Sequence, residues 1–175
     1  MNISDESRLI AAALNNYRER LNLISEDMFT ETPPGGGWSY AEVYSHILQA
    51  TLASFIGLER CTSDVCKPTT KGVNFLGWIV MFLGRMPVRL KQPAKVAERM
   101  PAVKISEEEA KNLIIKCRKR VEDILPLIKG SSAASRYKHP RLGMLNAVQW
   151  FKFIRIHLQH HLKQLDRVEK KFSIK

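Results

Sequence analysis

Apolar residues recur at spacings of three and four along most of the chain, a pattern typical of helices packed on one side. In the first segment the stripe consists of Ile10, Ala13, Tyr17, Leu21, Ile24 and Met28. Two prolines and three glycines in residues 31–37 (ETPPGGG) then interrupt the pattern, because neither residue type sustains a helix. The pattern therefore predicts one long N-terminal helix that ends before this loop.

Two serine–glutamate pairs mark the starts of the next long helices. Ser39 stands three residues before Glu42, and Ser106 stands three residues before Glu109, which is the spacing of a capping box. The second helix is expected from residue 40 to about residue 58. The third helix begins after Ser106, and its apolar face is formed by Ala110, Leu113, Ile114, Cys117, Val121, Ile124 and Leu125.

A loop and a fourth long helix complete the pattern. Pro126 is expected to kink or end the third helix, because its ring removes a helical hydrogen bond. Residues 130–135 (GSSAAS) are predicted to form a loop, and Asn146 is predicted to cap a last helix that runs to about residue 171. The stripe of this helix consists of Ala147, Trp150, Ile154, His157, His161, Leu165, Val168 and Phe172.

Residues 67–104 read as an insert between the second and third long helices, and they hold four of the eight prolines. The apolar run at residues 73–84 is well short of the ~20 residues that cross a membrane. It predicts a short helix near residues 75–86, followed by an extended basic linker. Trp78, Met81 and Phe82 are expected to pack in the core, with a cover over a functional site, a dimer contact or a membrane contact as alternatives.

No segment shows convincing strand alternation, and no internal repeat is visible. Four long helices with one long crossover predict an all-α fold, a four-helix bundle with the crossover between the second and third long helices. A chain of 175 residues suits one domain with a sizeable core, so residues 1–175 are expected to form a single four-helix-bundle domain.

The net charge of +11 is unevenly distributed. Residues 1–66 hold 4 Lys and Arg against 9 Asp and Glu, whereas residues 67–175 hold 24 against 8. This asymmetry suggests an anionic partner such as a nucleic acid, a membrane surface or a small acidic substrate. A well-solvated surface with an oriented dipole is an equally weighted alternative.

The rest of the composition is that of an ordinary globular protein, with 45% hydrophobic residues. Cys61, Cys66 and Cys117 are too few and odd in number for a disulfide framework, so free thiols in a reducing compartment are expected. The acidic and polar start MNISDESRL lacks the basic region of a signal peptide. The expected localisation is cytoplasmic.

Three of the five histidines lie within residues 150–168 (WFKFIRIHLQHHLKQLDRV). His157 and His161 occupy successive positions of the apolar stripe, one turn apart, and His160 lies on its flank. A buried imidazole costs about 1–3 kcal/mol when its nitrogens lack partners. Two histidines at i and i+4 can direct their nitrogens at one metal ion. A hydrogen-bonded core pair and a pH-sensitive contact are the alternatives.

A third metal ligand would have to come from another helix. His46 lies in the second helix on a face with Val43, Ala50, Ala53 and Gly57, whose small side chains would let a neighbouring helix come close. His139 is a poorer candidate, because it precedes Pro140 in a basic loop. Three histidines with an open coordination position are the layout of a catalytic rather than a structural zinc-like site.

Two segments, GGWSYAEVYSHI and HPRLGMLNAVQWFKFIRIHLQHHLKQLDRV, resemble the DinB-like (DinB/YfiT) superfamily of bacterial metal-binding four-helix bundles. In that family a Trp-Ser pair opens the second helix and a histidine follows one to two turns later. A late helix then carries a tryptophan, a His-x3-His pair and a glutamine. The matching residues here, which span nearly the whole chain, are Trp38, Ser39, His46, His139, Pro140, Gly143, Trp150, His157, His161 and Gln164.

The resemblance implies a divalent cation, commonly nickel or zinc, held by His46, His157 and His161. His160 could replace His161, because a spacing of three from His157 also suits one ion. Glu42 could orient His46, although its capping box already explains it, and Gln164 could orient a ligand or be a flank residue. No catalytic residue or general base can be assigned.

Characterised relatives include thiol transferases and isomerases that act with low-molecular-weight thiols such as bacillithiol or mycothiol. The resemblance therefore implies a metal-dependent transferase with a thiol cosubstrate, or a hydrolytic relative, and a homodimer by analogy. A non-enzymatic metal-binding or stress-associated dimer is the alternative. Nucleic-acid binding ranks third, because aromatic residues are not interleaved with the basic clusters. A membrane partner is not expected.

Overall fold

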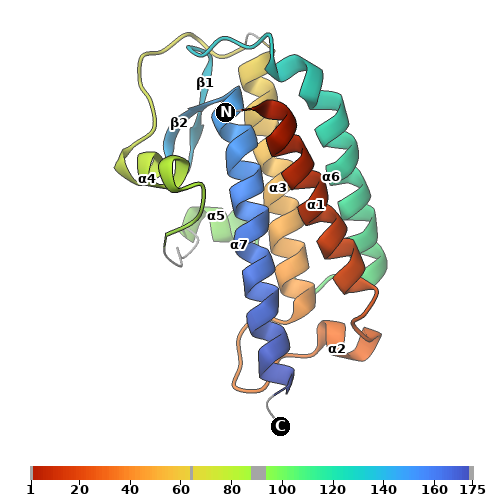
Figure 1. Cartoon of the computed structure of the whole chain (residues 1–175). Coiled ribbons are helices and arrows are strands. Elements are labelled where there is room, and N and C mark those ends of the chain that lie inside the picture. The colour runs from red at the N-terminus through yellow and green to blue at the C-terminus, as the bar shows by residue number, and fades with distance from the viewer. Residues whose placement is uncertain (1, 64, 88–93, 174–175) are drawn as a thin grey trace.

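Four long helices run alongside one another in the computed structural model (Figure 1), which describes residues 2–63, 65–87 and 94–173. They are α1 (Ile3–Leu21), α3 (Tyr40–Thr62), α6 (Glu107–Ile128) and α7 (Ala147–Ser173). The remaining elements are α2 (Glu26–Thr30), α4 (Phe75–Leu83), α5 (Ala94–Arg99), β1 (Arg136–His139) and β2 (Gly143–Asn146). The predicted four-helix bundle is confirmed.

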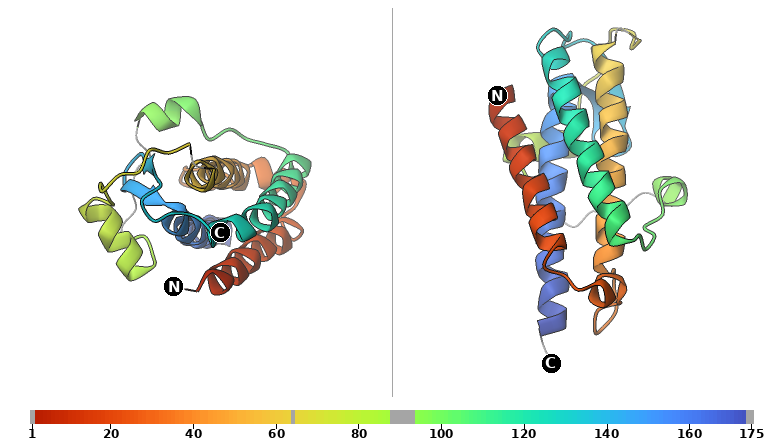
Figure 2. Two further views of the ribbon diagram at one scale, coloured as in Figure 1. Left: turned by 90° about the horizontal axis from the view of Figure 1, so that it is seen from above. Right: turned by 90° about the vertical axis from the view of Figure 1, so that its right-hand side faces the viewer.

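The core lies between the apolar stripes of the four long helices. In the view from above (Figure 2), α3 packs against both α6 and α7, and α1 packs against the same two helices from the other side. The largest fully buried side chains include Tyr17, Tyr44, Phe55 and Phe151, one or more from three of these helices. The stripe of α7 lies mostly in this core, as the pattern predicted, although His157 is only partly buried.

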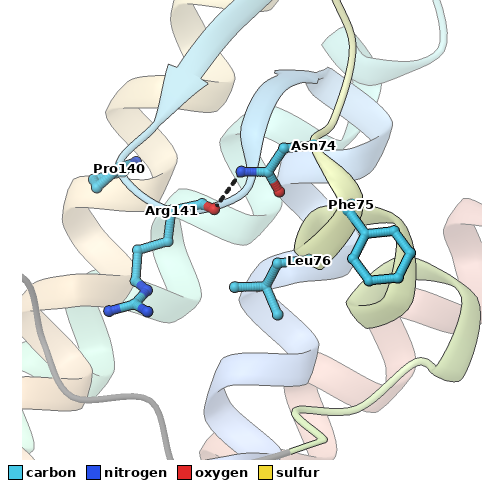
Figure 3. A pocket seen from close by; sticks show the side chains of 5 residues that line it. All are labelled: Asn74, Phe75, Leu76, Pro140 and Arg141. Carbon is cyan, nitrogen blue, oxygen red and sulfur yellow. Dashed lines mark hydrogen bonds between the residues drawn. The ribbon is translucent and has the colours of Figure 1, made fainter.

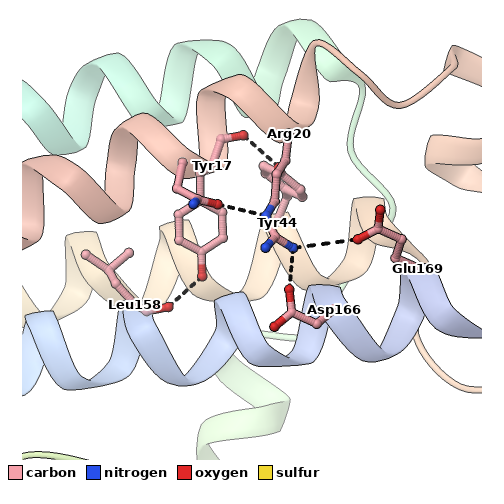
Figure 4. A network of polar contacts seen from close by, with 7 residues as sticks. Tyr17, Arg20, Tyr44, Leu158, Asp166 and Glu169 are labelled. Atoms are coloured by element: carbon pink, nitrogen blue, oxygen red, sulfur yellow. Dashed lines mark hydrogen bonds and ion pairs between the residues drawn. The ribbon is translucent and has the colours of Figure 1, made fainter.

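Two buried tyrosines fix α1 between α3 and α7. The Tyr44 hydroxyl donates to the Tyr17 carbonyl at 2.7 Å, and the Tyr17 hydroxyl donates to the Leu158 carbonyl at 2.8 Å (Figure 4). Burial raises the pKa of both phenols well above the ordinary value, so both stay protonated donors. At the edge of the same interface Arg20 pairs with Asp166 at 2.6 Å.

The predicted helix starts are confirmed, and two helices run further than expected. Both capping boxes form: the Ser39 hydroxyl accepts from the Glu42 N–H, the Ser106 hydroxyl accepts from the Glu109 N–H, and each carboxylate accepts from its serine N–H. Helix α3 continues to Thr62 instead of ending near residue 58. Helix α6 passes through Pro126 and ends at Ile128, two residues later.

The prediction of one continuous N-terminal helix is wrong, because α1 ends at Leu21 and α2 is a separate short helix. Asn22 caps the C-terminal end of α1, because its N–H donates to the Arg18 carbonyl. Ser25, whose backbone is extended, is the N-cap of α2. Both residue types favour helix ends over helix interiors. Met28, the last position of the expected stripe, is consequently 37% exposed, whereas the neighbouring Phe29 is buried.

The mostly helical fold also contains a small two-stranded hairpin, of which the sequence showed no convincing sign. Strands β1 and β2 pair antiparallel, from Arg136 opposite Asn146 to His139 opposite Gly143. Each strand has four residues, which is too few to reveal an alternating pattern in the sequence. Gly143 adopts a φ of +88°, and a side chain there would collide with the backbone of residues 72–74. Leu145 points into the core, so the hairpin anchors the start of α7.

Helix α4 is docked on the tip of this hairpin. The Asn74 side chain donates to the Arg141 carbonyl at 2.8 Å (Figure 3) and accepts from the Gly77 N–H at 2.8 Å, which caps the helix. The Asn74 N–H donates to the Leu142 carbonyl at 2.9 Å. Gly77 lies so close to this carbonyl that a Cβ atom would be 2.3 Å from its oxygen.

The other end of α4 is held by a buried ion pair. Gly84 ends the helix in the left-handed conformation, and its carbonyl accepts from Arg155 of α7 at 3.1 Å. Arg155 also pairs with Glu6 of α1 at 2.5 Å, and both side chains are about nine-tenths buried. The expected extended linker after α4 falls partly on residues 88–93, outside the described residues, and its next part forms helix α5.

The three cysteines are free thiols, as expected. Burial raises the pKa of Cys61 and of Cys117 to about 12, so these two remain protonated at neutral pH. Within the described ranges, no helix combines the length and the apolar character needed to cross a membrane.

A Gly77→Ala substitution should destabilise the protein by about 1–3 kcal/mol, because the new methyl group would overlap the Leu142 carbonyl and push α4 away from the hairpin. Urea unfolding followed by circular dichroism measures this. Gly130→Ala is the matched control, since a Cβ at Gly130 meets no atom within 4 Å. Equal stability of the two variants would contradict the docking described here.

Candidate metal centre

Three histidines from two helices meet inside the bundle. His46 comes from α3, and His157 and His161 come from adjacent turns of α7. One nitrogen atom from each ring lies within 4.8 Å of the others. The ring centroids of His46 and His161 are 4.9 Å apart, and those of His157 and His161 are 4.7 Å apart. The residues selected from the sequence are thus the ones that the fold brings together.

The two helices can approach because of one glycine. A Cβ atom at Gly57 of α3 would lie 2.8 Å from the Trp150 indole of α7, so only glycine fits opposite this ring. Gly57 is on the face that also carries His46, as the small-residue pattern suggested. The close contact sets the separation of α3 and α7 and places imidazoles from both helices within reach of one point.

Aromatic side chains surround the three imidazoles. The Trp38 ring lies 5.1 Å from the His46 ring, and the Phe153 ring stacks on the His157 ring at 5.1 Å with an angle of 20° between planes. Burial lowers the pKa of His46, places that of His157 well below its ordinary value and lowers that of His161 to about 3. All three rings are therefore neutral at pH 7, which is the form that binds metal ions.

Gln164 determines which nitrogen of His161 carries the proton. Its side-chain oxygen lies 2.7 Å from His161 Nδ1 and can only accept, so Nδ1 donates and Nε2 keeps its lone pair. His161 Nε2 lies 3.1 Å from Nε2 of His157. Gln164 is therefore an orienting residue rather than a flank residue, the kind of partner that commonly fixes a metal-binding histidine.

The arrangement fits a bound cation as well as a hydrogen bond between the rings. Two nitrogens that share an ion at ~2.0–2.1 Å each would be about 3–3.4 Å apart, close to the 3.1 Å between the two Nε2 atoms. The Nδ1 atoms of His46 and His157 are buried without a hydrogen-bond partner within the described part of the chain. A cation between the two Nε2 atoms would lie on the side of the His157 ring away from its Nδ1 atom, so of these two costly buried nitrogens only Nδ1 of His46 could gain the cation as a partner.

The two other histidines have different surroundings. The His160 ring lies 5.2 Å from the His161 ring, but His160 does not belong to the described three-histidine group. His139 Nδ1 accepts hydrogen bonds from the backbone N–H groups of Arg141 and Leu142 at 3.1 Å each. His139 therefore has a structural role in the hairpin turn. Burial lowers its pKa to about 4.

The imidazoles line one wall of a cavity of about 1000 Å³. Its walls come from α3, the hairpin, α7 and the insert, which contributes Met86, Val96 and Met100. Most of the lining is apolar, and its charged lining residues within the described part of the chain are all basic: Lys138, Arg141, Arg167 and Lys171. A separate depression bounded by Asn74, Phe75, Leu76, Pro140 and Arg141 contains none of the three histidines (Figure 3).

The residues that form the basic lining were not identified from the sequence. Arg141 lies at the hairpin tip, and Arg167 and Lys171 lie one and a half to three turns beyond His161 on α7. The Lys171 ammonium donates to the Gly36 carbonyl at 2.5 Å and so ties the glycine loop to the end of α7 beside the cavity. The charge asymmetry of the sequence was the available signal, but it could not show which cations gather at one opening.

The metal-free protein should lose stability as the pH falls from 7 to 5. His139 and His161 have folded pKa values of about 4 and about 3, below the ordinary value of 6.5, so the unfolded chain takes up their protons first. The free energy of unfolding that the two neutral side chains contribute is fully present above pH 6.5. At pH 5, each of them should have lowered the free energy of unfolding by about 2 kcal/mol. Urea unfolding of chelator-treated protein at pH 7, 6 and 5 measures the loss.

His139→Asn is the control for this pH dependence, because an asparagine oxygen can accept the same two N–H groups without titrating. The variant should lose about 2 kcal/mol less than the parent between pH 7 and pH 5. The same loss in both proteins would show that His139 is not buried in its neutral form.

Comparison with solved structures shows the same fold in three proteins. YfiT from Bacillus subtilis, described as a probable metal-dependent hydrolase with an unusual four-helix bundle topology, matches with a TM-score of 0.65 and 9% identity over 99% of this chain and 89% of its own. TT2238, described as a four-helix bundle protein, matches with a TM-score of 0.61 and 15% identity, over 95% of this chain and 99% of its own. A mycothiol-dependent maleylpyruvate isomerase matches with a TM-score of 0.56 and 11% identity, over 98% of this chain and 66% of its own.

No curated protein sequence matched the chain. The DinB superfamily matches residues 9–165, which hold all three histidines, the whole of α3 and α7 as far as Leu165. The sequence resemblance, the bundle and this match agree, and the chain belongs to the DinB superfamily.

Proposed function

We propose that this protein is a divalent-metal-dependent enzyme that uses a low-molecular-weight thiol to transform a small, negatively charged electrophile. The observation that carries the proposal is the convergence of His46, His157 and His161 on the wall of a cavity of about 1000 Å³. Three neutral nitrogen ligands facing open space are the layout of a catalytic metal site. Imidazole donors suit zinc, copper, iron and nickel, and the family resemblance favours nickel or zinc among these metals.

A bound divalent cation with an open position would lower the pKa of a thiol or of water and so supply a nucleophile at neutral pH. The chain's own residues would prepare the site for this. Gln164 holds the Nδ1 proton of His161 and keeps Nε2 directed at the other rings. Trp38 and Phe153 cover His46 and His157 from water, which strengthens charge interactions in the cavity.

The lining of the cavity favours an amphipathic anion as substrate. Arg141, Arg167, Lys138 and Lys171 supply positive charge, and no carboxylate lies among the described lining residues. Ala50, Ala53, Met86 and Phe153 offer apolar surface next to the histidines. An acidic thiol, or an electrophile with a carboxylate or phosphate and an apolar body, matches both features.

Two structural neighbours support a reaction of this kind. YfiT is described as a probable metal-dependent hydrolase, and a second neighbour as a mycothiol-dependent isomerase. Hydrolysis, with water in the place of the thiol, is the second candidate reaction, because the same site would activate either nucleophile. The homodimer expected from the sequence stays a prediction.

The protein should bind close to one equivalent of Ni²⁺ or Zn²⁺ per chain, and the His157→Ala, His161→Ala double variant should lose at least ~100-fold in affinity, because two of three ligands are gone. Isothermal titration and elemental analysis of tag-free protein measure this. Gln164→Ala should weaken binding ~10–100-fold, since the ring of His161 loses its orienting partner.

His160→Ala is the matched control, because this ring lies beside His161 but outside the three-histidine group. Its metal affinity should stay within a few-fold of the parent. Loss of metal in His160→Ala with retention in His161→Ala would instead assign the third ligand to His160. Absence of metal binding in the parent would overturn the proposed function.

Thiol binding should be visible without any turnover. Adding mycothiol or bacillithiol to the nickel-loaded protein should produce a thiolate-to-nickel absorption band, because the open position would take the sulfur as thiolate. Arg167→Ala and Arg141→Ala should weaken this binding several-fold by removing positive charge from the cavity. If the metal-loaded protein gives no absorption band with thiols but hydrolyses activated esters, the result would favour the hydrolase. If it gives neither the band nor ester hydrolysis, the result would favour a non-enzymatic metal-binding protein.

A further inference from the structure

Helix α4 carries an apolar face that the bundle leaves uncovered. Phe75, Trp78 and Phe82 are 77%, 55% and 74% exposed, and they lie at i, i+3 and i+7 on one side of the helix. The rings of Trp78 and Phe82 stack on each other at 5.3 Å between centroids. The opposite side of α4 is buried at Gly77 and Val80. A helix that is apolar on both sides normally has a partner for each side.

The exposure of these rings is a fixed feature of the fold. Asn74 holds the start of α4 to the hairpin, and Arg155 holds its last carbonyl to α7. Both views place α4 at the outer edge of the molecule, outside the four long helices (Figures 1 and 2). Phe75 also borders the depression beside the hairpin tip, and Trp78 and Phe82 lie further along the exposed side of the helix.

The charge around α4 favours an anionic occupant. Residues 65–97 contain six Lys and Arg and no Asp or Glu. Lys71 and Arg85 lie in the described residues on either side of the helix. The carboxylate of Glu6, which reaches the end of α4 through Arg155, is already neutralised by that arginine. A second copy of this face would bring like charges together.

The apolar area is also small for a protein interface. Three aromatic side chains of ~150–250 Å² each, exposed by half to three quarters, present roughly 300–500 Å². Each partner of a standard interface buries about 800 Å². A projecting aromatic helix with flanking lysine and arginine residues instead matches the helices that lie in the surface of anionic membranes.

We propose that α4 docks this protein on anionic lipid membranes, with Phe75, Trp78 and Phe82 inserted below the head groups and Lys71 and Arg85 contacting lipid phosphates. A helix of nine residues is about 14 Å long, so α4 can lie in the interface but cannot cross the bilayer. The sequence had favoured core packing for Trp78 and Phe82, with a membrane contact among the less favoured alternatives. Their exposure is what changes this interpretation.

Flotation with lipid vesicles tests the proposal on the full chain. The protein should bind phosphatidylcholine vesicles that contain about one-third phosphatidylglycerol and should bind pure phosphatidylcholine vesicles at least ~10-fold more weakly. Tryptophan emission should move to shorter wavelength on binding, because Trp78 is 55% exposed, whereas Trp38 is partly buried and Trp150 is buried. Raising the salt concentration should weaken binding.

Phe75→Ser, Phe82→Ser should reduce vesicle binding at least ~10-fold without loss of thermal stability, since both side chains are largely exposed. Ile115→Ser, Leu127→Ser is the matched control, because these side chains of α6 are 63% and 53% exposed on another helix. The His157→Ala, His161→Ala variant should bind vesicles as the parent does. Equal binding by both serine pairs, no preference for anionic vesicles, or a dimer that Phe75→Ser, Phe82→Ser dissociates would overturn the proposal.

Discussion

The close contact between α3 and α7 is the constraint on which the site depends. The indole of Trp150 occupies the space that any side chain at residue 57 would fill. Because these two helices are in contact there, a histidine almost two turns into α3 faces two histidines near the middle of α7. The cost of placing three imidazoles in apolar surroundings is then offset in part by their contacts with one another and with Gln164, in a group that could hold a cation.

The long-range arrangement could be predicted because three-four periodicity is a property of the whole helix. The stripes of α3, α6 and α7 follow from many residues, so single exceptions such as Pro126 do not change them. Short elements were missed for the opposite reason. Four-residue strands and the turn between α1 and α2 are decided by one or two residues, such as Gly143 and Asn22, and by tertiary contacts that no local pattern records.

The candidate site was predicted in part for similar reasons. His157 and His161 were found because they violate the apolar stripe of their own helix, and His46 because small residues surround it. The role of Gln164 could be resolved only with the ring positions, since a glutamine three residues after a histidine has many other uses. The cavity and its basic opening join residues from the hairpin, the insert and the end of α7, a combination that depends on the assembled fold.

The pairing of Glu6 with Arg155 ties the first turn of the chain to the insert, although the two are far apart in sequence. Removing one member of such a buried pair leaves the other charge unpaired at a cost of about 3–5 kcal/mol. Evolution can therefore change residues 6 and 155 only together, or after the crossover has found another anchor. Among relatives with inserts of different length, covariation of these two positions should mark those in which α4 keeps its place.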